Sequence, residues 1–201
     1  NEDLSVDANY THVENLLSID SFINNLAFEI ISEGDSYEIK YWRAKTKVND
    51  GFGDAKWRVT TQDFESVMGS GYNWLEIATA DSNVPTRDFL NNLLENETFK
   101  IKFINRIADL LNSAFIKERF DAVVNLTFDE IDPLLDEDKN RAPKDRFYGI
   151  GEKDRLLNWI KERPTLLRNQ MNDLFNIDKT IDLDLNVSNH NAGYITVNTI
   201  D

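Results

Sequence analysis

The residues that decide the fold are 34–65, which read GDSYEIKYWRAKTKVNDGFGDAKWRVTTQDFE. Two runs within them, 37–45 and 56–62, are rich in aromatic and β-branched residues, as strands are. Between these runs, residues 49–54 (NDGFGD) have the composition of a turn. The stretch therefore predicts a β-hairpin in the N-terminal third of the chain.

Acidic residues stand at both outer ends of this predicted hairpin. Asp35 precedes the first strand, and Asp63 and Glu65 follow the second. Because a hairpin returns its outer ends to one place, these carboxylates can converge on a small volume. Carboxylate oxygens suit a divalent cation that binds a phosphate. Asp35 with Asp63 or Glu65 is also the one carboxylate pair that the sequence singles out for glycoside hydrolysis, and this alternative stays open.

The composition is that of a globular, acidic protein. The chain has 201 residues, of which 41% are hydrophobic, and this is enough for one domain with a core of ordinary size. The net charge of −14, with basic residues scattered among acidic ones, argues against nucleic acid or an anionic membrane as a partner. The absence of cysteine excludes disulfides and thiolate chemistry. No apolar run reaches the roughly 20 residues that would predict a membrane span.

Most of the remaining chain has the three- and four-residue apolar spacing of helices. The clearest helix is predicted between a cap at Ser18 or Asp20 and its end at Gly34, directly before Asp35. Residues 63–85 have no clear period and predict a long loop, a kind of segment that is often functional. Further helices are predicted over residues 10–17, 85–94, 99–111 (capped by Thr98), 117 to a kink or boundary near Pro133, 153–162 and 164–175.

The last part of the chain changes to the two-residue alternation of strands. Residues 180–187 (TIDLDLNV) and 193–200 (GYITVNTI) alternate apolar and polar side chains on either side of a turn rich in Asn, Ser and Gly. They predict a second, C-terminal β-hairpin. The expected fold class is α+β and mainly helical, with residues 1–177 as the main domain and residues 178–201 as this hairpin or the start of a further sheet.

Six stretches resemble one known family when taken in order. They read SIDSFINNLAFEI at 18–30, IKYWR at 39–43, KWRVTTQDFE at 56–65, FKIKFINRIADLLNSAF at 99–115, WIKERPTLLRNQMNDLF at 159–175 and NAGYITVN at 191–198. This succession resembles the CotH kinase family, the secreted and spore-coat atypical kinases. The resemblance covers nearly the whole chain and keeps the order of the family.

The resemblance implies the C-terminal lobe of a protein-kinase-like fold that uses ATP and Mg²⁺ to phosphorylate hydroxyl groups of a protein substrate. Asp35 matches the catalytic Asp of the family, Asp63 matches its first metal-binding Asp, and Glu65 falls on the second. Glu38 stands where it can supply a further oxygen ligand. The residues that bind the nucleotide stay unknown. The resemblance also implies a bacterial protein that is secreted or held at the cell surface.

Two interpretations of function stay open on this resemblance. Family members carry Asn beside the catalytic Asp, whereas this chain reads Glu33-Gly34-Asp35. Residues 1–11 contain neither the glycine-rich turn nor the phosphate-binding Lys of an N-terminal lobe. We therefore expect the chain to be part of a larger kinase domain and to be inactive by itself. The alternative is a degenerate kinase-like domain that acts as a non-catalytic cell-surface, adhesion or structural module.

Overall fold

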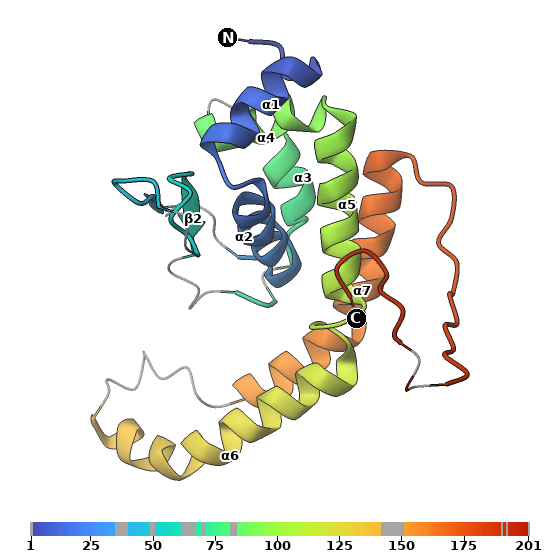
Figure 1. The fold of residues 1–201 in the computed structure, drawn as a ribbon. Helices are drawn as coiled ribbons and strands as arrows, with labels where there is room; N and C mark the ends of the chain where they lie inside the picture. The colour runs from blue at the N-terminus through green and yellow to red at the C-terminus, as the bar shows by residue number, and fades with distance from the viewer. Residues whose placement is uncertain are drawn as a thin grey trace.

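The computed structural model describes most of the chain. The residues described are 2–34, 40–48, 51–61, 67–69, 71–80, 84–141 (backbone alone for 135–141), 151–189, 191 and 193–200. Seven helices and one two-stranded sheet make up this part (Figure 1). In chain order they are α1 Asp7–Leu16, α2 Ile19–Ser32, β1 Lys40–Trp42, β2 Arg58–Thr60, α3 Trp74–Thr79, α4 Pro85–Leu94, α5 Glu97–Leu111, α6 Lys117–Arg141 and α7 Glu152–Phe175.

Helix α2 is the most enclosed element of the fold. Ten of its fourteen residues are buried, and it contacts α3, α5, α7 and β2. A helix that is apolar around most of its circumference is stable in water when other elements surround it, and here they do. The prediction of a helix that ends before Gly34 is confirmed, because α2 ends at Ser32 and Glu33 is its C-cap.

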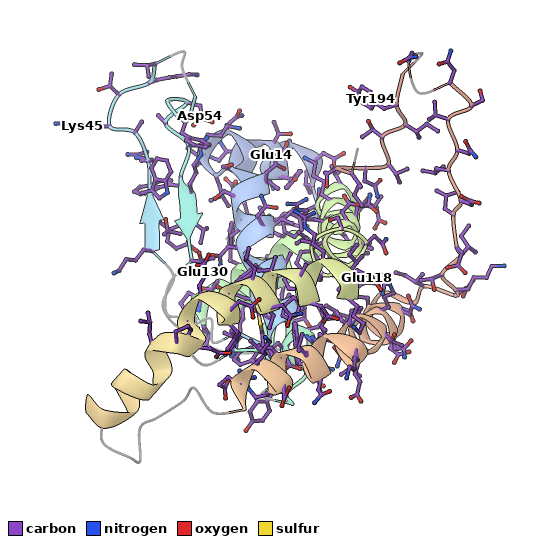
Figure 2. The ribbon with its side chains drawn as sticks, turned by 90° about the horizontal axis from the view of Figure 1, so that it is seen from below. Glu14, Lys45, Asp54, Glu118, Glu130 and Tyr194 are labelled. Atoms are coloured by element: carbon purple, nitrogen blue, oxygen red, sulfur yellow. The ribbon has the colours of Figure 1, made fainter. Side chains whose placement is uncertain are left out.

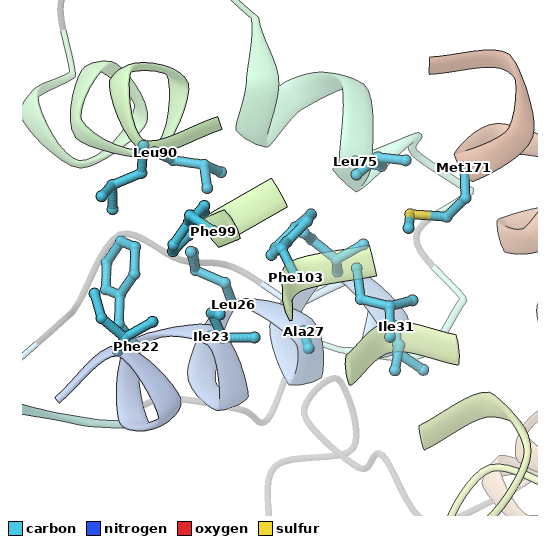
Figure 3. Close-up of a cluster of buried hydrophobic side chains, with 14 of the residues drawn as sticks. Phe22, Ile23, Leu26, Ala27, Ile31, Leu75, Leu90, Phe99, Phe103 and Met171 are labelled. Carbon is cyan, nitrogen blue, oxygen red and sulfur yellow. The ribbon is translucent and has the colours of Figure 1, made fainter. Parts of the chain in front are cut away.

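The centre of the core lies between α2 and α5 (Figure 3). Phe99 and Phe103 on α5 are fully buried, and their rings stack with centroids 6.2 Å apart. Figure 3 shows both rings between α2, which contributes Phe22 and Leu26, and helices α3 and α4. Helix α7 closes the cluster from a further side through Met171. The apolar stripe that predicted α5 is thus the stripe that the fold buries.

The predicted N-terminal hairpin is confirmed, with shorter strands. Strands β1 and β2 pair antiparallel, with Lys40 opposite Thr60. The second strand starts later than predicted because Trp57 bonds elsewhere. Its N–H donates to the Leu16 carbonyl at 2.8 Å, and its carbonyl accepts from the Ser18 N–H at 2.8 Å. These bonds attach the hairpin to the connection between α1 and α2.

A bidentate ion pair lies near the turn of the hairpin. Asp54 accepts hydrogen bonds from Arg58 Nη1 at 2.7 Å and Nη2 at 2.9 Å, and from the Lys56 N–H at 3.0 Å. The guanidinium also lies over the Phe52 ring, 5.0 Å from its centroid. The Arg58 hydrogen bonds, followed by the Lys56 N–H, lower the pKa of Asp54 to about 2.

We expect the Asp54 carboxyl to titrate near pH 2 in the folded chain, which carbon-detected NMR measures directly. Because the folded pKa lies below the ordinary value of 3.8, the stabilisation from this pair is present above about pH 4 and is lost as pH falls toward 2. In Arg58→Gln the pKa of Asp54 should rise toward its ordinary value. An unchanged midpoint in that variant would show that Arg58 is not the cause.

The predicted loop at residues 63–85 contains a helix, and this part of the prediction is wrong. Helix α3 starts after Asn73, whose Oδ1 accepts the Glu76 N–H at 3.2 Å. It buries Trp74 and Leu75 against the core. At six residues, α3 is too short to show a helical period in the sequence. Burial of its two apolar residues, and not local propensity, stabilises it.

The predicted cap of α5 is also corrected. The helix starts after Asn96 and not after Thr98. Asn96 Oδ1 accepts the Phe99 N–H at 3.2 Å, and Asn96 Nδ2 donates to Asp7 Oδ1 at 3.2 Å. Both residue types are good caps, and Asn is somewhat the better of the two. The contact with α1 favours Asn96.

Residues 152–175 form the single helix α7, where the sequence predicts two helices divided at Pro164. An interior proline costs about 3 kcal/mol, because it removes one hydrogen bond and crowds the preceding turn. Ile160, Leu167 and Met171 lie on one buried stripe that continues across the proline. Burying each such side chain contributes about 1.5–3 kcal/mol, which outweighs that cost. Helix α6 likewise continues past Pro133 and bends along its length (Figures 1 and 2).

The predicted C-terminal hairpin is not formed in the described part of residues 178–200. These residues contain no strand, and a single bridge between Val197 and Ile200 takes its place. The chain leaves α7 as an extended ribbon, away from the helices, and then returns to α5 (Figure 1). An isolated hairpin is marginal in water, so the alternating pattern does not by itself produce one.

Among the described residues, no helix combines the length and the apolar composition that crossing a bilayer would require.

Candidate functional site

The four candidate site residues, Asp35, Glu38, Asp63 and Glu65, lie outside the described residues. The chain on either side of them is described. It consists of the end of α2, the two strands of the hairpin, and residues 67–69. The geometry of these flanking residues decides whether the two segments that carry the candidates start and end close together.

One pair of flanking residues meets at the end of α2. The Met68 N–H donates to the Ser32 carbonyl at 2.6 Å, and the Gly69 N–H donates to Glu33 Oε2 at 2.7 Å. Gly34 follows directly and donates its N–H to the Glu29 carbonyl at 2.8 Å. The exit of the chain from α2 and its return after the hairpin therefore lie side by side.

The other pair of flanking residues meets in the hairpin. Lys40 is paired with Thr60 in the register of β1 and β2. The segment of residues 35–39 thus joins Gly34 to Lys40, and residues 62–66 join the end of β2 to residues 67–69. The residues that flank both segments therefore lie at the same two places, which are the end of α2 and the pair of Lys40 with Thr60. This is the arrangement that the hairpin pattern predicts for the flanks of the candidate carboxylates.

Glu33 holds the end of α2 against the returning chain. Its backbone is left-handed, with φ 56°, and it caps the helix. Glu33 is 3% exposed, and its carboxylate accepts the Gly69 N–H and, at 3.3 Å, the Trp159 Nε1–H. Arg163 Nη1 lies 3.3 Å from its other oxygen. Three elements distant in sequence therefore meet at one buried carboxylate.

Arg163 is the counter-charge of Glu33 and a second cap of α2. Its side chain is almost fully buried, its Nε donates to the Ile31 carbonyl at 2.9 Å, and its Nη2 donates to the Ile30 carbonyl. These carbonyls belong to the last turn of the helix and have no partner within it. Burial lowers the pKa of Arg163, and the Glu33 carboxylate opposes this shift. A guanidinium stays protonated in such a site.

Sequence reasoning missed both Glu33 and Arg163, although a signal for Arg163 exists. Arg163 falls on the same stripe as Ile160 and Leu167, at the i+3 and i−4 positions. A charged residue on an apolar stripe indicates a buried charge that needs a partner. Glu33 carries no comparable signal, because an acidic residue at a helix end is common on protein surfaces.

Helix α7 also contacts the returning chain through Arg155. Arg155 Nη1 donates to the Val67 carbonyl at 3.4 Å, while its other nitrogens bind Glu152. Gly69 has φ +127°, a conformation open to glycine, and an added Cβ would lie 2.8 Å from Arg155 Nη1. Glycine therefore permits this close approach.

A polar groove of about 850 Å³ lies beside the hairpin and reaches Thr61, two residues before Asp63. This volume falls in the range of small-molecule sites. The polar groove is lined by side chains of α1, α2, α5 and the hairpin, among them Asp20, Asn24, Asn25, Arg58, Thr60, Thr61 and Lys102. Within the described ranges, no three acidic or histidine side chains gather as a metal site would require.

The arrangement is that of a mainly helical domain in which one hairpin joins two acidic segments beside a buried helix. The model of the CotH kinase protein family matches residues 1–167. The chain therefore belongs to the CotH kinase protein family, and the resemblance seen in the sequence is confirmed. The match includes the four candidate residues, Glu33 and Arg163, and it ends within α7. Comparison with curated proteins gave no match, and comparison with solved structures gave none either.

Proposed function

We propose that this chain carries the catalytic and metal-binding residues of an ATP- and Mg²⁺-dependent protein kinase. The observation that carries the proposal is the position of the flanking residues. Gly34 and Met68 lie at the same end of the hairpin, and both candidate segments span the same two places. Membership of the CotH kinase protein family, over a range that includes every candidate residue, supports it further.

The roles follow from the chemistry of phosphoryl transfer. Asp35 orients the hydroxyl of a protein substrate and accepts its proton, while the γ-phosphoryl group of ATP passes to the hydroxyl oxygen and ADP leaves. Asp63, Glu65 and Glu38 would hold Mg²⁺, and their carboxylate oxygens are the ligands that this ion prefers. When bound, Mg²⁺ supplies positive charge to the phosphate oxygens.

The described residues contribute position to this site. Glu33, Trp159 and Arg163 fix the end of α2 one residue before Gly34, and the Gly69 N–H fixes the chain after the hairpin to the same carboxylate. A kinase site depends on placing carboxylates to within fractions of an ångström. The polar groove runs along the hairpin from the turn at Gly51 and Phe52 to Thr61, and it offers space for a substrate beside the hairpin.

The test uses the complete natural protein with Mg²⁺ and radiolabelled ATP. We expect phosphate incorporation into protein, and we expect Asp63→Ala to reduce it at least a hundredfold through loss of a metal ligand. Glu130→Ala is the matched control, because Glu130 is an exposed acidic residue on α6 far along the chain from the hairpin. Equal incorporation by wild type and Asp63→Ala would refute the kinase site at this position.

A non-catalytic module is the second candidate. It is favoured by Gly34 beside Asp35, where the resemblance implies Asn, and by Glu65 at the position of the second metal-binding Asp. Thermal unfolding separates the two. A nucleotide that binds adds about 2.7 kcal/mol to stability at a hundredfold excess over its dissociation constant. An unchanged melting temperature with Mg²⁺ and ATP, together with no incorporation, would favour the non-catalytic module.

A secreted or cell-surface location, with a protein as substrate, is part of the same proposal. Family membership supports it, and the net charge of −14 suits a secreted or surface protein that stays soluble. Cell fractionation with an antibody to the chain tests the location independently of activity.

A further inference from the structure

Residues 180–187, here called the C-terminal strand segment, have the pattern of a strand but pair with no strand in the part of the chain that the structure describes. Ile181, Leu183 and Leu185 are 75, 62 and 45% exposed. Asp182 and Asp184 between them are exposed as well. Among the described residues, the segment makes no backbone hydrogen bond. Unpaired backbone with alternating side chains is a template for pairing with another strand.

The C-terminal strand segment is attached to the helices on both sides. Before it, the chain ends α7 with Asn176 in the left-handed conformation, and the Ile177 N–H donates to the Asn172 carbonyl at 2.9 Å. After it, the chain returns to α5 (Figures 1 and 2; Tyr194 marks the returning part). A segment attached at both ends loses less conformational entropy on pairing than a free tail does.

The second attachment is specific. Asp109 on α5 is 2% exposed, and its Oδ2 accepts the Thr199 N–H at 3.0 Å and the Thr199 hydroxyl at 2.6 Å. Its Oδ1 accepts Asn198 Nδ2 at 3.2 Å. Arg106 Nη1 donates to Thr199 Oγ1 at 2.9 Å and completes the contact. A buried carboxylate is thus satisfied by the chain end, which binds the returning chain to the domain body.

We propose that the C-terminal strand segment is a protein-binding site that adds a strand to a partner sheet. Its backbone groups would pair with the edge strand of that sheet, so that Ile181, Leu183 and Leu185 continue the apolar face of the sheet. The segment lies beyond residue 167, where the family match ends, so the inference is independent of the proposed kinase site.

The charges of the segment select the partner. In a register that keeps the apolar faces together, a second copy would place Asp182 and Asp184 opposite the same acidic residues. Like charges directly opposite each other destabilise a strand pair. A partner strand that alternates apolar residues with Lys or Arg places opposite charges there. The partner is therefore a protein with an exposed edge strand of alternating apolar and basic residues.

The test uses the whole 201-residue chain and a labelled synthetic peptide of alternating lysine and valine. We expect fluorescence anisotropy to show binding, and a peptide of the same composition in non-alternating order to bind at least tenfold more weakly. Leu183→Asp, at an exposed position, should weaken binding of the alternating peptide at least tenfold. The double variant Asp182→Lys with Asp184→Lys should instead bind a peptide of alternating glutamate and valine.

The control separates strand pairing from general attraction to an acidic chain. The control variant Asp154→Lys with Glu162→Lys changes the net charge by the same amount as Asp182→Lys with Asp184→Lys, at exposed positions on α7. Salt titration measures how much of the binding comes from net charge alone. With that contribution removed, the control variant should bind the lysine–valine peptide within about twofold of wild type. Equal binding of the alternating and non-alternating peptides would overturn the proposal. Concentration-dependent dimers that Leu183→Asp abolishes would overturn it in favour of a second copy.

Discussion

Arg163→Ala is expected to lower the free energy of unfolding by about 3–5 kcal/mol, the usual loss when one partner of a buried ion pair is removed. The variant leaves the Glu33 carboxylate buried without its cation. It also removes the donors to the Ile30 and Ile31 carbonyls at the end of α2. A buried charge without a partner and unsatisfied buried carbonyls each carry a desolvation cost.

Chemical denaturation followed by tryptophan fluorescence measures this effect, and Trp159 reports locally because its indole binds Glu33. Lys161→Ala on the same helix is the control, because Lys161 is exposed and should change stability by less than about 0.5 kcal/mol. The double variant Arg163→Met with Glu33→Gln removes both charges. With the single variants Arg163→Met and Glu33→Gln it completes a double-mutant cycle, in which it should be more stable than the sum of those two losses predicts, by about 1–3 kcal/mol. Additive losses would show that the two side chains are not coupled.

Phe103→Ala is expected to lower the free energy of unfolding by about 3–5 kcal/mol, because it creates a cavity in the core. The Phe103 ring is fully buried, stacks on Phe99 with centroids 6.2 Å apart, and meets the Phe175 ring of α7 edge-on at the same centroid distance. Figure 3 places it between α2 and α3. The neighbouring rings, Phe99 on α5 and Phe175 on α7, belong to different helices. They cannot both move into the space that alanine leaves, so the cavity persists.

Ile101→Ala tests the same helix without the core. Ile101 is 50% exposed, so its truncation should cost less than about 1 kcal/mol. Urea unfolding of both variants gives the comparison, and equal denaturant dependence would show that both unfold from the same compact state. A loss at Phe103 no larger than that at Ile101 would contradict the position of α5 at the centre of the core.

Much of the helical framework follows from local signals, namely apolar spacing and the position of proline. The period between Ser18 and Gly34 predicts α2, and Pro85 predicts the start of α4, because both signals are local. The hairpin follows from two β-rich runs joined by a turn. Local signals fail at α3, which is too short to show a period, and at Pro164, where burial on both sides of the proline keeps α7 continuous.

The candidate site divides in the same way. Asp35, Asp63 and Glu65 are singled out by their places at the ends of a hairpin, and the described flanking residues meet as that pattern predicts. Their own positions and roles stay predictions. The side chains that hold the flanks together, Glu33 and Arg163, were missed. They are 130 residues apart, and no local pattern pairs two charges at such a distance.

The sequence by itself predicts the fold class, the N-terminal hairpin, the acidic candidate residues and the family. Periodicity and turn composition are properties of neighbouring residues, and the family likeness is read from the sequence directly. Three features depend on the folded domain instead: the charge pair at the end of α2, the continuity of α7 through Pro164, and the unpaired state of residues 180–187. Each is decided by burial between distant segments. A strand pattern forms a strand when a partner supplies hydrogen bonds, and the described part of this domain supplies none to that segment.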